Sequence, residues 1–146
     1  MAQYKLGKRS MKKLVGVHPA LAQCVLHAIS ISKHDFSVIE GVRTMETQRR
    51  YVRTGKSKTM DSYHLYGLAV DLCPYKSGVG LVWNDMKAYK EVSRAMHLAM
   101  AYMHLDYDGV HLINGGEAWG WDYPHWQLSG LKSKYDIRSL AIIKTV

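Results

Sequence analysis

Cysteine is scarce in this sequence. The chain has two, Cys24 and Cys73, which lie far apart and lack the close pairing typical of structural zinc sites. Two buried free thiols are the simpler interpretation of cysteines placed in this way. The sequence therefore predicts a domain that is held together by its core rather than by cysteine cross-links.

Long apolar runs are also absent. A membrane-spanning helix needs roughly 18 consecutive apolar residues, and no stretch reaches that length. The apolar segment 14–28 is interrupted by His18, Pro19 and Gln23, whereas the core of a signal peptide is continuously apolar. We therefore expect a chain that is made in the cytoplasm without a signal peptide and has no transmembrane segment.

Acidic residues are few relative to basic ones. Twelve Asp and Glu oppose twenty Lys and Arg, which gives a formal net charge of +8. This excess favours an anionic partner, either nucleic acid or a cell envelope, although a solvated basic face is an equal alternative. The chain has no aromatic and basic motif of the kind that recognises nucleic acid, so no specific nucleic-acid binding is expected.

Repeats, linkers and low-complexity segments are missing as well. The composition is that of an ordinary globular domain, with 47% hydrophobic and 22% charged residues. The 146 residues therefore predict one domain spanning 1–146, with no separate cell-wall-binding domain. Nothing in the sequence demands more than a monomer.

The pattern of apolar residues predicts the elements of this domain. Helical spacing favours helices over 19–30 and 86–104, and Thr44 can cap another over 45–53. Runs of β-branched and apolar residues favour strands over 37–43 and 68–73, and a further strand at the end of 122–128. Helices combined with an antiparallel sheet in one small domain predict an α+β fold.

The intervening segments predict less regular structure. A short helix is expected near 10–15, a polar loop over 56–63, and turns over 74–79 and at Gly115-Gly116. The tail from 129 to 146 contains an apolar group at 140–143, which favours a last strand or helix.

Two short stretches carry the residues that bear chemistry. His64 lies seven residues before Asp71, at the entrance to the strand expected over 68–72, and both are zinc-ligand types. His125 follows Asp122 by three residues, and Pro124 between them argues against a helical two-histidine motif. His125 would complete three ligands, and three ligands with an open fourth position are typical of catalytic zinc.

Other interpretations of these residues stay open at this point. If His64, Asp71 and His125 bind zinc, Asp122 is a nearby carboxylate that can take a proton from water. The same residues could instead be unrelated polar side chains, with the two aspartates in a turn and a cap. Cys73 follows Asp71 by two residues and would share its face in a strand, so it is a minor alternative ligand.

The arrangement resembles a known family of zinc peptidases. The resemblance rests on two motifs, Ser62-x-His64-x-x-Gly67-x-Ala69-x-Asp71 and Asp122-x-Pro124-His125-Trp126. They are similar to those of the D-Ala-D-Ala carboxypeptidase and L-alanyl-D-glutamate endopeptidase family, whose wider group includes lysostaphin-type enzymes and the hedgehog signalling domain. Further similarity to small phage endolysins lies upstream, in segments 17–21 and 35–48, so that the resemblance covers about 14–128.

The resemblance implies roles for individual residues. His64, Asp71 and His125 are implied to bind Zn²⁺. Asp122 is implied to be the general base, where many relatives have glutamate, and Arg43 to bind substrate and stabilise the oxyanion. Ser62 and Gln48 are implied to contribute to substrate binding.

The same resemblance implies a function. We expect a zinc metallopeptidase that hydrolyses peptidoglycan stem peptides, at the L-Ala–D-Glu bond, and acts as a phage or prophage endolysin on the cell wall after release. The main alternative is a D-Ala-D-Ala carboxypeptidase, which acts on the same polymer. A third possibility is a non-catalytic, zinc-containing binding module with this fold.

Overall fold

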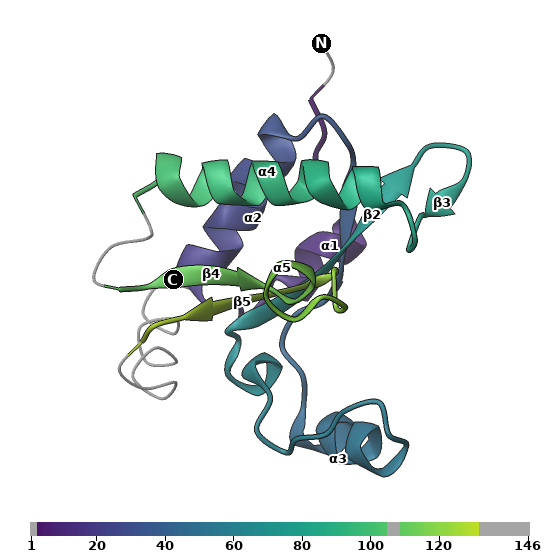
Figure 1. Cartoon of the computed structure of the whole chain (residues 1–146), viewed down its shortest axis with the longest axis vertical. Coiled ribbons are helices and arrows are strands. Elements are labelled where there is room, and N and C mark those ends of the chain that lie inside the picture. Colours follow the sequence, from purple (N-terminus) through teal and green to yellow (C-terminus); the bar gives the residue numbers. More distant parts are fainter. Residues whose placement is uncertain (1–2, 105–108, 132–146) are drawn as a thin grey trace.

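The computed structural model describes residues 3–104 and 109–131 (Figure 1). The elements follow one another in the order α1 (Lys8–Lys13), α2 (Pro19–Ile31), β1 (Phe36–Glu40), α3 (Met45–Arg53), the 3₁₀ helix η1 (Tyr63–Tyr66), β2 (Ala69–Lys76), β3 (Gly80–Leu81), α4 (Met86–Tyr102), β4 (His111–Asn114), α5 (Gly115–Trp119) and β5 (His125–Ser129).

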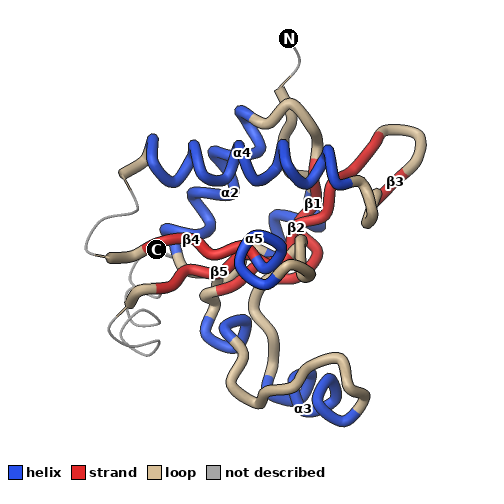
Figure 2. Tube along the Cα trace, viewed as in Figure 1, coloured by secondary structure: helices blue, strands red, loops and turns tan. Residues whose placement is uncertain are grey.

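The strands form an antiparallel sheet with the order β1-β2-β5-β4, and β3 pairs with β2. Helices α2 and α4 lie together on one side of this sheet, whereas α3 and η1 extend from the opposite end of the molecule (Figures 1 and 2). This architecture confirms the α+β fold with flanking helices that the sequence predicts. No helix among the described residues is long and apolar enough to cross a lipid bilayer.

The hydrophobic core lies between the helical layer and the sheet. Leu21 from α2 and Met96 from α4 meet Val70 and Leu72 from β2 there, together with Trp126 from β5. Because successive side chains of a strand point to opposite faces, the alternate residues of β2 and β5 face away from this core. The core therefore fixes which residues of the central strands are free to build a site.

Helix starts agree with simple capping chemistry. The Nδ1 atom of His18 accepts a hydrogen bond from the Ala20 N–H at 3.0 Å, at the start of α2. Thr44 caps α3 through the Thr47 N–H, as predicted, and Asp85 caps α4 through the Ala88 N–H. Each cap satisfies a backbone N–H that has no partner inside its helix.

Two predictions of turns need correction. The turn expected over 74–79 is present only at 77–79, because strand β2 continues through Pro74 to Lys76. Proline fits in the strand because the hydrogen bonds at this point do not need its missing N–H. The Pro74 carbonyl accepts from the Val82 N–H, and the Tyr75 N–H donates to the Asp35 carbonyl. Gly115 and Gly116 begin α5 instead of forming a turn, with Asn114 as the cap.

Other boundaries shift by a few residues. Strand β1 ends at Glu40 rather than at 43, α4 ends at Tyr102 rather than at 104, and part of the expected 56–63 loop winds into η1. The short N-terminal helix begins two residues earlier than predicted. The strand or helix expected near 140–143 lies outside the described residues.

Candidate metal centre and catalytic cleft

Strand register places Asp71 and His125 side by side. The two residues are direct partners in the β2–β5 pair, next to the core pair Val70 and Trp126. Directly opposed residues of antiparallel strands have side chains in contact distance. Asp71 and His125 therefore meet on the sheet face that points away from the helices.

His64 reaches the same point from η1. The Ser62 hydroxyl accepts from the His64 N–H at 3.2 Å and so starts this single turn of helix. Gly67 ends the turn with a left-handed φ of 70°, and a Cβ there would collide with the Gly16 carbonyl. Glycine is therefore required at this position for both conformation and space, which keeps His64 at a fixed distance from β2.

The three side chains converge on one point. One ligand atom from each of His64, Asp71 and His125 can be chosen so that all lie within 4.8 Å of one another. The Asp71 Oδ1 atom lies 3.3 Å from His64 Nε2 and 3.5 Å from His125 Nδ1. These separations match the edge of a tetrahedron around zinc, which is about 3.3 Å for bonds of about 2.0–2.1 Å.

The hydrogen bonds behind the histidines fix which nitrogen faces the centre. The Nδ1–H of His64 donates to the Gly41 carbonyl at 2.9 Å, and the Nε2–H of His125 donates to Gln127 Oε1 at 2.8 Å. Each neutral ring therefore presents a lone pair toward Asp71, which also offers only acceptors. Acceptors that face one another need a proton or a metal ion between them, and two imidazole nitrogens with a carboxylate oxygen are a donor set that fits a bound metal ion.

Electrostatics at the centre agree with this arrangement. Burial by itself raises the pKa of Asp71, but the hydrogen bonds that protonated His125 and His64 rings donate to it outweigh this effect and hold the pKa well below the usual range. Burial lowers the pKa of His125, but the hydrogen bonds to Asp71 and Gln127 reverse this and leave it raised. The site thus favours an ionised carboxylate beside positive charge.

A β-bulge brings Glu40 to the same face. Val38 pairs with the core residue Leu72, but the register shifts by one residue and Glu40 then pairs with Asp71. In a regular strand Glu40, two residues after Val38, would point into the core with it; because Ile39 is an extra residue in a bulge, Glu40 points to the other face. The bulge therefore turns a carboxylate toward the site, where its Oε1 atom lies 3.9 Å from His64 Nδ1.

Arg43 is held in a dense polar network. Its guanidinium pairs with the Glu40 carboxylate through two nitrogens, and its Nη1 donates to Gln48 Oε1 at 2.7 Å. The ring of Tyr51 lies under it at 4.7 Å, and Ser62 Oγ lies 3.4 Å from Nη1. A guanidinium with this many fixed partners is held in one orientation at the wall of the cleft.

Gln48 occupies a different place from the one expected of a substrate-binding residue. Its side chain is fully buried, with an exposed fraction of 0%. Besides accepting from Arg43, its amide donates to Ser57 Oγ at 2.9 Å and to the Thr59 carbonyl at 2.6 Å. Gln48 therefore holds Arg43 and the 57–59 loop in position, and does not line the cleft.

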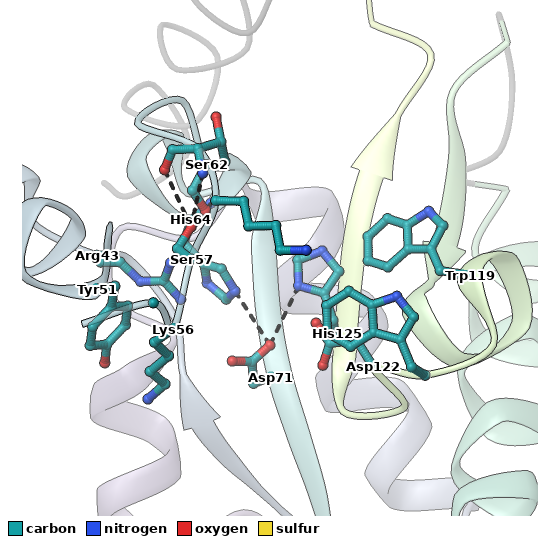
Figure 3. Close-up of a pocket in the computed structure, with 14 residues that line it drawn as sticks. Arg43, Tyr51, Lys56, Ser57, Ser62, His64, Asp71, Trp119, Asp122 and His125 are labelled. Carbon is teal, nitrogen blue, oxygen red and sulfur yellow. Dashed lines mark hydrogen bonds and ion pairs between the residues drawn. The ribbon is translucent and has the colours of Figure 1, made fainter. Parts of the chain in front are cut away.

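Asp122 lies beside the three converging side chains (Figure 3). Its segment is fixed by Asn114, whose Nδ2 donates to the Tyr123 carbonyl at 2.9 Å and to the His125 carbonyl at 3.0 Å. Burial raises the pKa of Asp122, and the charge of Asp71 raises it further against the opposing effects of His125, His64 and Arg43. A raised pKa makes a carboxylate a better proton acceptor.

These groups open into a single cleft of about 760 Å³. Five of the residues singled out from the sequence line it with Arg43: Ser62, His64, Asp71, Asp122 and His125. Its remaining lining consists of the 55–59 loop, Tyr51, Trp119 and Trp121. Cys73 is buried, and its thiol lies 3.9 Å from the Tyr89 hydroxyl. It is not part of the cluster of potential metal ligands, which consists of His64, Asp71 and His125.

Three residues that position the site are not among those predicted from the sequence. Gln127 lies two residues after His125 in β5 and therefore on the same strand face. This spacing is visible in the sequence and could have predicted that Gln127 lies beside His125. Glu40 depends on the bulge, and Asn114 depends on the packing of α5 against 122–125. Neither of these has a signature in sequence spacing alone.

Comparison with known proteins agrees with this geometry. A family model described as phage L-alanyl-D-glutamate peptidase matches residues 1–122. The chain belongs to this family. The L-alanyl-D-glutamate peptidase of Escherichia phage T5 is 34% identical over 99 residues, which cover 66% of this chain and 72% of that protein.

A solved structure supports the same placement. The crystal structure of the Serratia marcescens L-Ala D-Glu endopeptidase ChiX matches with a TM-score of 0.76 and 36% identity, and the match covers 87% of this chain and 91% of that one. The resemblance and the fold predicted from the sequence motifs are thus confirmed. The family match ends at Asp122, so the placement of His125 rests on the geometry described above.

Proposed function

We propose that this member of the phage L-alanyl-D-glutamate peptidase family is a zinc-dependent endolysin that hydrolyses the L-Ala–D-Glu bond of peptidoglycan stem peptides. The observation that carries the proposal is the convergence of His64, Asp71 and His125 in one cleft with Asp122 and Arg43. Three ligands with an open side toward a substrate cleft are typical of a catalytic rather than a structural zinc site.

His64, Asp71 and His125 are the residues that would hold the metal. Two imidazoles and one carboxylate suit zinc, and the hydrogen bonds that the rings make to Gly41 and Gln127 orient both of them. A metal bound there supplies Lewis-acid chemistry, since it polarises a carbonyl and makes water more acidic.

Asp122 moves the proton. Its carboxylate accepts a proton from the water that adds to the scissile carbonyl carbon. When the carbon–nitrogen bond breaks, the same carboxyl group gives this proton to the leaving amine of D-Glu. The peptide bond is thereby replaced by a carboxylate on L-Ala and an amine on D-Glu.

Arg43 stabilises negative charge as the carbonyl becomes tetrahedral. Its guanidinium is fixed by Glu40, Gln48 and Tyr51, so little reorganisation accompanies charge development. Ser62 lines the cleft beside it and is available to bind the substrate. Gln48 acts as a positioning residue through Arg43 rather than by touching the substrate.

The substrate places this reaction at the cell wall. We infer that the protein acts there after release from the cytoplasm in which it is made. The net charge of +8 favours contact with an anionic envelope.

Product analysis tests the proposed bond. The zinc-loaded full chain is incubated with purified peptidoglycan, and the soluble products are separated by mass. We expect peptides with a new N-terminal D-Glu. Release of terminal D-Ala alone would instead identify a D-Ala-D-Ala carboxypeptidase, and zinc binding without any cleavage would identify a non-catalytic module.

The role of Asp122 is tested by an isosteric change. We expect Asp122→Asn to lower kcat by about 10²–10⁴-fold while zinc is retained, because general acid–base catalysis contributes about that much. Glu117→Gln is the matched control, because Glu117 is an exposed carboxylate on α5 that pairs with His97 outside the cleft. An Asp122→Asn protein as active as the parent would remove Asp122 from the mechanism.

A further inference from the structure

The two walls of the catalytic cleft differ in chemistry. One side of Asp71 carries basic and polar side chains, namely Lys56, Ser57, Tyr51 and Arg43 (Figure 3). Trp119 lies on the other side, beside His125. Lys58 belongs to the same loop as Lys56, and Trp121 contacts Trp119 with ring centres 6.2 Å apart. We call these the lysine wall, Lys56 and Lys58, and the tryptophan wall, Trp119 and Trp121.

The lysine wall is held in place by buried structure. The loop that carries it is tied down at Ser57 and Thr59, both of which accept hydrogen bonds from the buried amide of Gln48. The Ser57 N–H also donates to the Tyr51 carbonyl at 3.1 Å. A loop with such anchors presents its side chains to the cleft in a defined way, although both lysines are exposed.

The charges of the lysine wall are available to a ligand. Arg43 is already paired with Glu40, whereas no carboxylate among the described residues forms an ion pair with Lys56 or Lys58. The Lys56 Nζ atom lies 4.3 Å from the centre of the Tyr51 ring, which supports a cation without neutralising it. The wall is therefore suited to an anionic group of the substrate.

The tryptophan wall presents apolar ring surface to the same cleft. The side chains of Trp119 and Trp121 are 45% and 68% exposed, which leaves large areas of aromatic ring open to a ligand. Trp119 also lies against His125, with ring centres 5.3 Å apart. Exposed indoles beside a reaction centre are suited to the flat apolar face of a sugar or an alkyl group.

The proposed substrate is equally asymmetric about its scissile bond. On the L-Ala side the peptide continues to the lactyl ether and N-acetylmuramyl sugar, which carry no charge near the bond. On the other side D-Glu is linked onward through its side-chain carboxyl group, so its α-carboxylate is free and negative. The two halves of the substrate therefore match the two walls of the cleft.

We propose that the two walls set the direction of the bound stem peptide, with the D-Glu α-carboxylate on Lys56 and Lys58 and the muramyl side on Trp119 and Trp121. This assignment rests on the proposed function and adds to it the residues that determine specificity. It makes the lysine wall a sensor of amidation, because conversion of the α-carboxylate to an amide (D-isoglutamine) removes the charge that the lysines bind.

Four soluble substrates test this orientation. They contain either D-Glu or D-isoglutamine, each with or without the N-acetylmuramyl group, and kcat/KM is measured with the zinc-loaded full chain. The parent is expected to prefer D-Glu over D-isoglutamine. The Lys56→Gln/Lys58→Gln double variant is expected to lose about two- to fivefold of this preference per lysine, the range for exposed ion pairs. Lys56→Arg/Lys58→Arg is expected to retain it.

The tryptophan wall has its own readout. Trp121→Ala is expected to reduce the preference for sugar-bearing substrates by about fivefold, which corresponds to removal of roughly 40 Å² of apolar contact. It is expected to leave the discrimination between D-Glu and D-isoglutamine unchanged. Controls are Lys87→Gln/Lys90→Gln on exposed positions of α4 and Trp83→Ala, since none of these residues lines the cleft.

Binding gives a measurement that is independent of turnover. Uncleaved substrate is titrated into Asp122→Asn protein by calorimetry, at low and at high ionic strength. The advantage of D-Glu over D-isoglutamine is expected to shrink at high salt, because exposed charges are screened. Adding Lys56→Gln/Lys58→Gln to this protein is expected to abolish the salt dependence of that advantage.

The outcomes separate the two proposals. If the parent cuts none of the four substrates between L-Ala and the following residue, the proposed function itself fails. If the parent cuts them but the lysine variants keep its D-Glu preference, only the orientation is wrong. Exchange of the two readouts, with the lysines affecting sugar preference and Trp121 affecting amide discrimination, would show that the peptide lies in the opposite direction.

Discussion

Single residues behind the ligands decide what the metal centre can bind. Gln127 accepts from His125 Nε2 and in turn donates to Ser129 Oγ at 2.9 Å, so a chain of buried hydrogen bonds sets the ring of His125. The Gly41 carbonyl does the same for His64. Removal of such a partner frees the ring to rotate or to change tautomer, without altering any ligand.

We expect Gln127→Ala to weaken zinc affinity by about 10–100-fold, the usual effect of removing a hydrogen-bond partner of a ligand histidine. Affinity is measured by competition with a chromogenic chelator. Ser129→Ala is the control, since it removes only the outer bond of the chain and is expected to have a smaller effect. Parent-like affinity in Gln127→Ala would show that His125 is oriented by other contacts.

Gln48 couples two parts of the cleft from a buried position. We expect Gln48→Leu to lower the free energy of unfolding by about 1–3 kcal/mol, because it leaves buried donors and acceptors unpaired. It is also expected to lower kcat/KM, since Arg43 and the 57–59 loop lose their shared anchor. Denaturant unfolding and steady-state kinetics measure the two effects.

Glu46→Gln provides the comparison for Gln48. It lies on the same helix but is exposed, and is expected to change both quantities little. A Gln48→Leu protein with lower stability but unchanged kcat/KM would restrict Gln48 to a structural role.

At the scale of elements, close approaches between segments place the catalytic groups. Helix α5 packs directly on the 122–123 segment, so a Cβ at Gly115 would collide with Asp122 and one at Gly116 with the ring of Tyr123. The N-terminus of α5 and the proposed base are therefore fixed relative to each other by the absence of two side chains. The bulge at Ile39 is another local feature of the backbone that places a side chain, because it turns Glu40 toward the site.

Gly116→Ala tests the importance of this contact. The added methyl group must displace the Tyr123 ring, and we expect a loss of about 1–3 kcal/mol in unfolding free energy, as for other overpacked sites. A fall in kcat is expected with it, because Asp122 precedes the displaced residue. Gly7→Ala is the matched control, since its φ is −73° and a Cβ there meets nothing within 4 Å.

Unchanged kcat in Gly116→Ala, at reduced stability, would show that Tyr123 moves without Asp122. Circular dichroism of both glycine variants establishes that each is folded before the kinetic comparison is made.

At the scale of the whole molecule, folding buries both cysteines. The Cys24 thiol donates to the Met96 carbonyl between α2 and α4, and burial raises its pKa to about 12. Burial also raises the pKa of Cys73. The folded chain therefore keeps both thiols protonated and shielded from reagents at neutral pH.

This burial makes stability depend on alkaline pH. The folded state retains the Cys24 proton while the unfolded state loses it above its ordinary pKa of 9.0, so the free energy of unfolding is expected to fall between pH 9.0 and about 12. Cys24→Ala is expected to show a shallower fall over this range in denaturant titrations. Equal slopes for the parent and Cys24→Ala would contradict the raised pKa.

Much of the fold could be predicted because local patterns and the core agree. Helices α2, α3 and α4 follow apolar spacing and caps, and β5 appears where the sequence predicts a strand. The errors at Pro74 and at Gly115-Gly116 have one origin. Proline and glycine usually break regular structure. Here neighbouring segments form hydrogen bonds around Pro74 and pack closely against Gly115 and Gly116, so the strand and the helix persist.

The sequence by itself determined the chemical inventory: two histidines, two aspartates and an arginine in an order that identifies the family. Tertiary structure decided which atoms face one another. Register set Asp71 against His125, a bulge turned Glu40 out of the core, and burial made Gln48 an anchor. The physical reason is that spacing along a chain specifies the face of an element, whereas distances between elements arise only when cores, bulges and close glycine contacts are packed together.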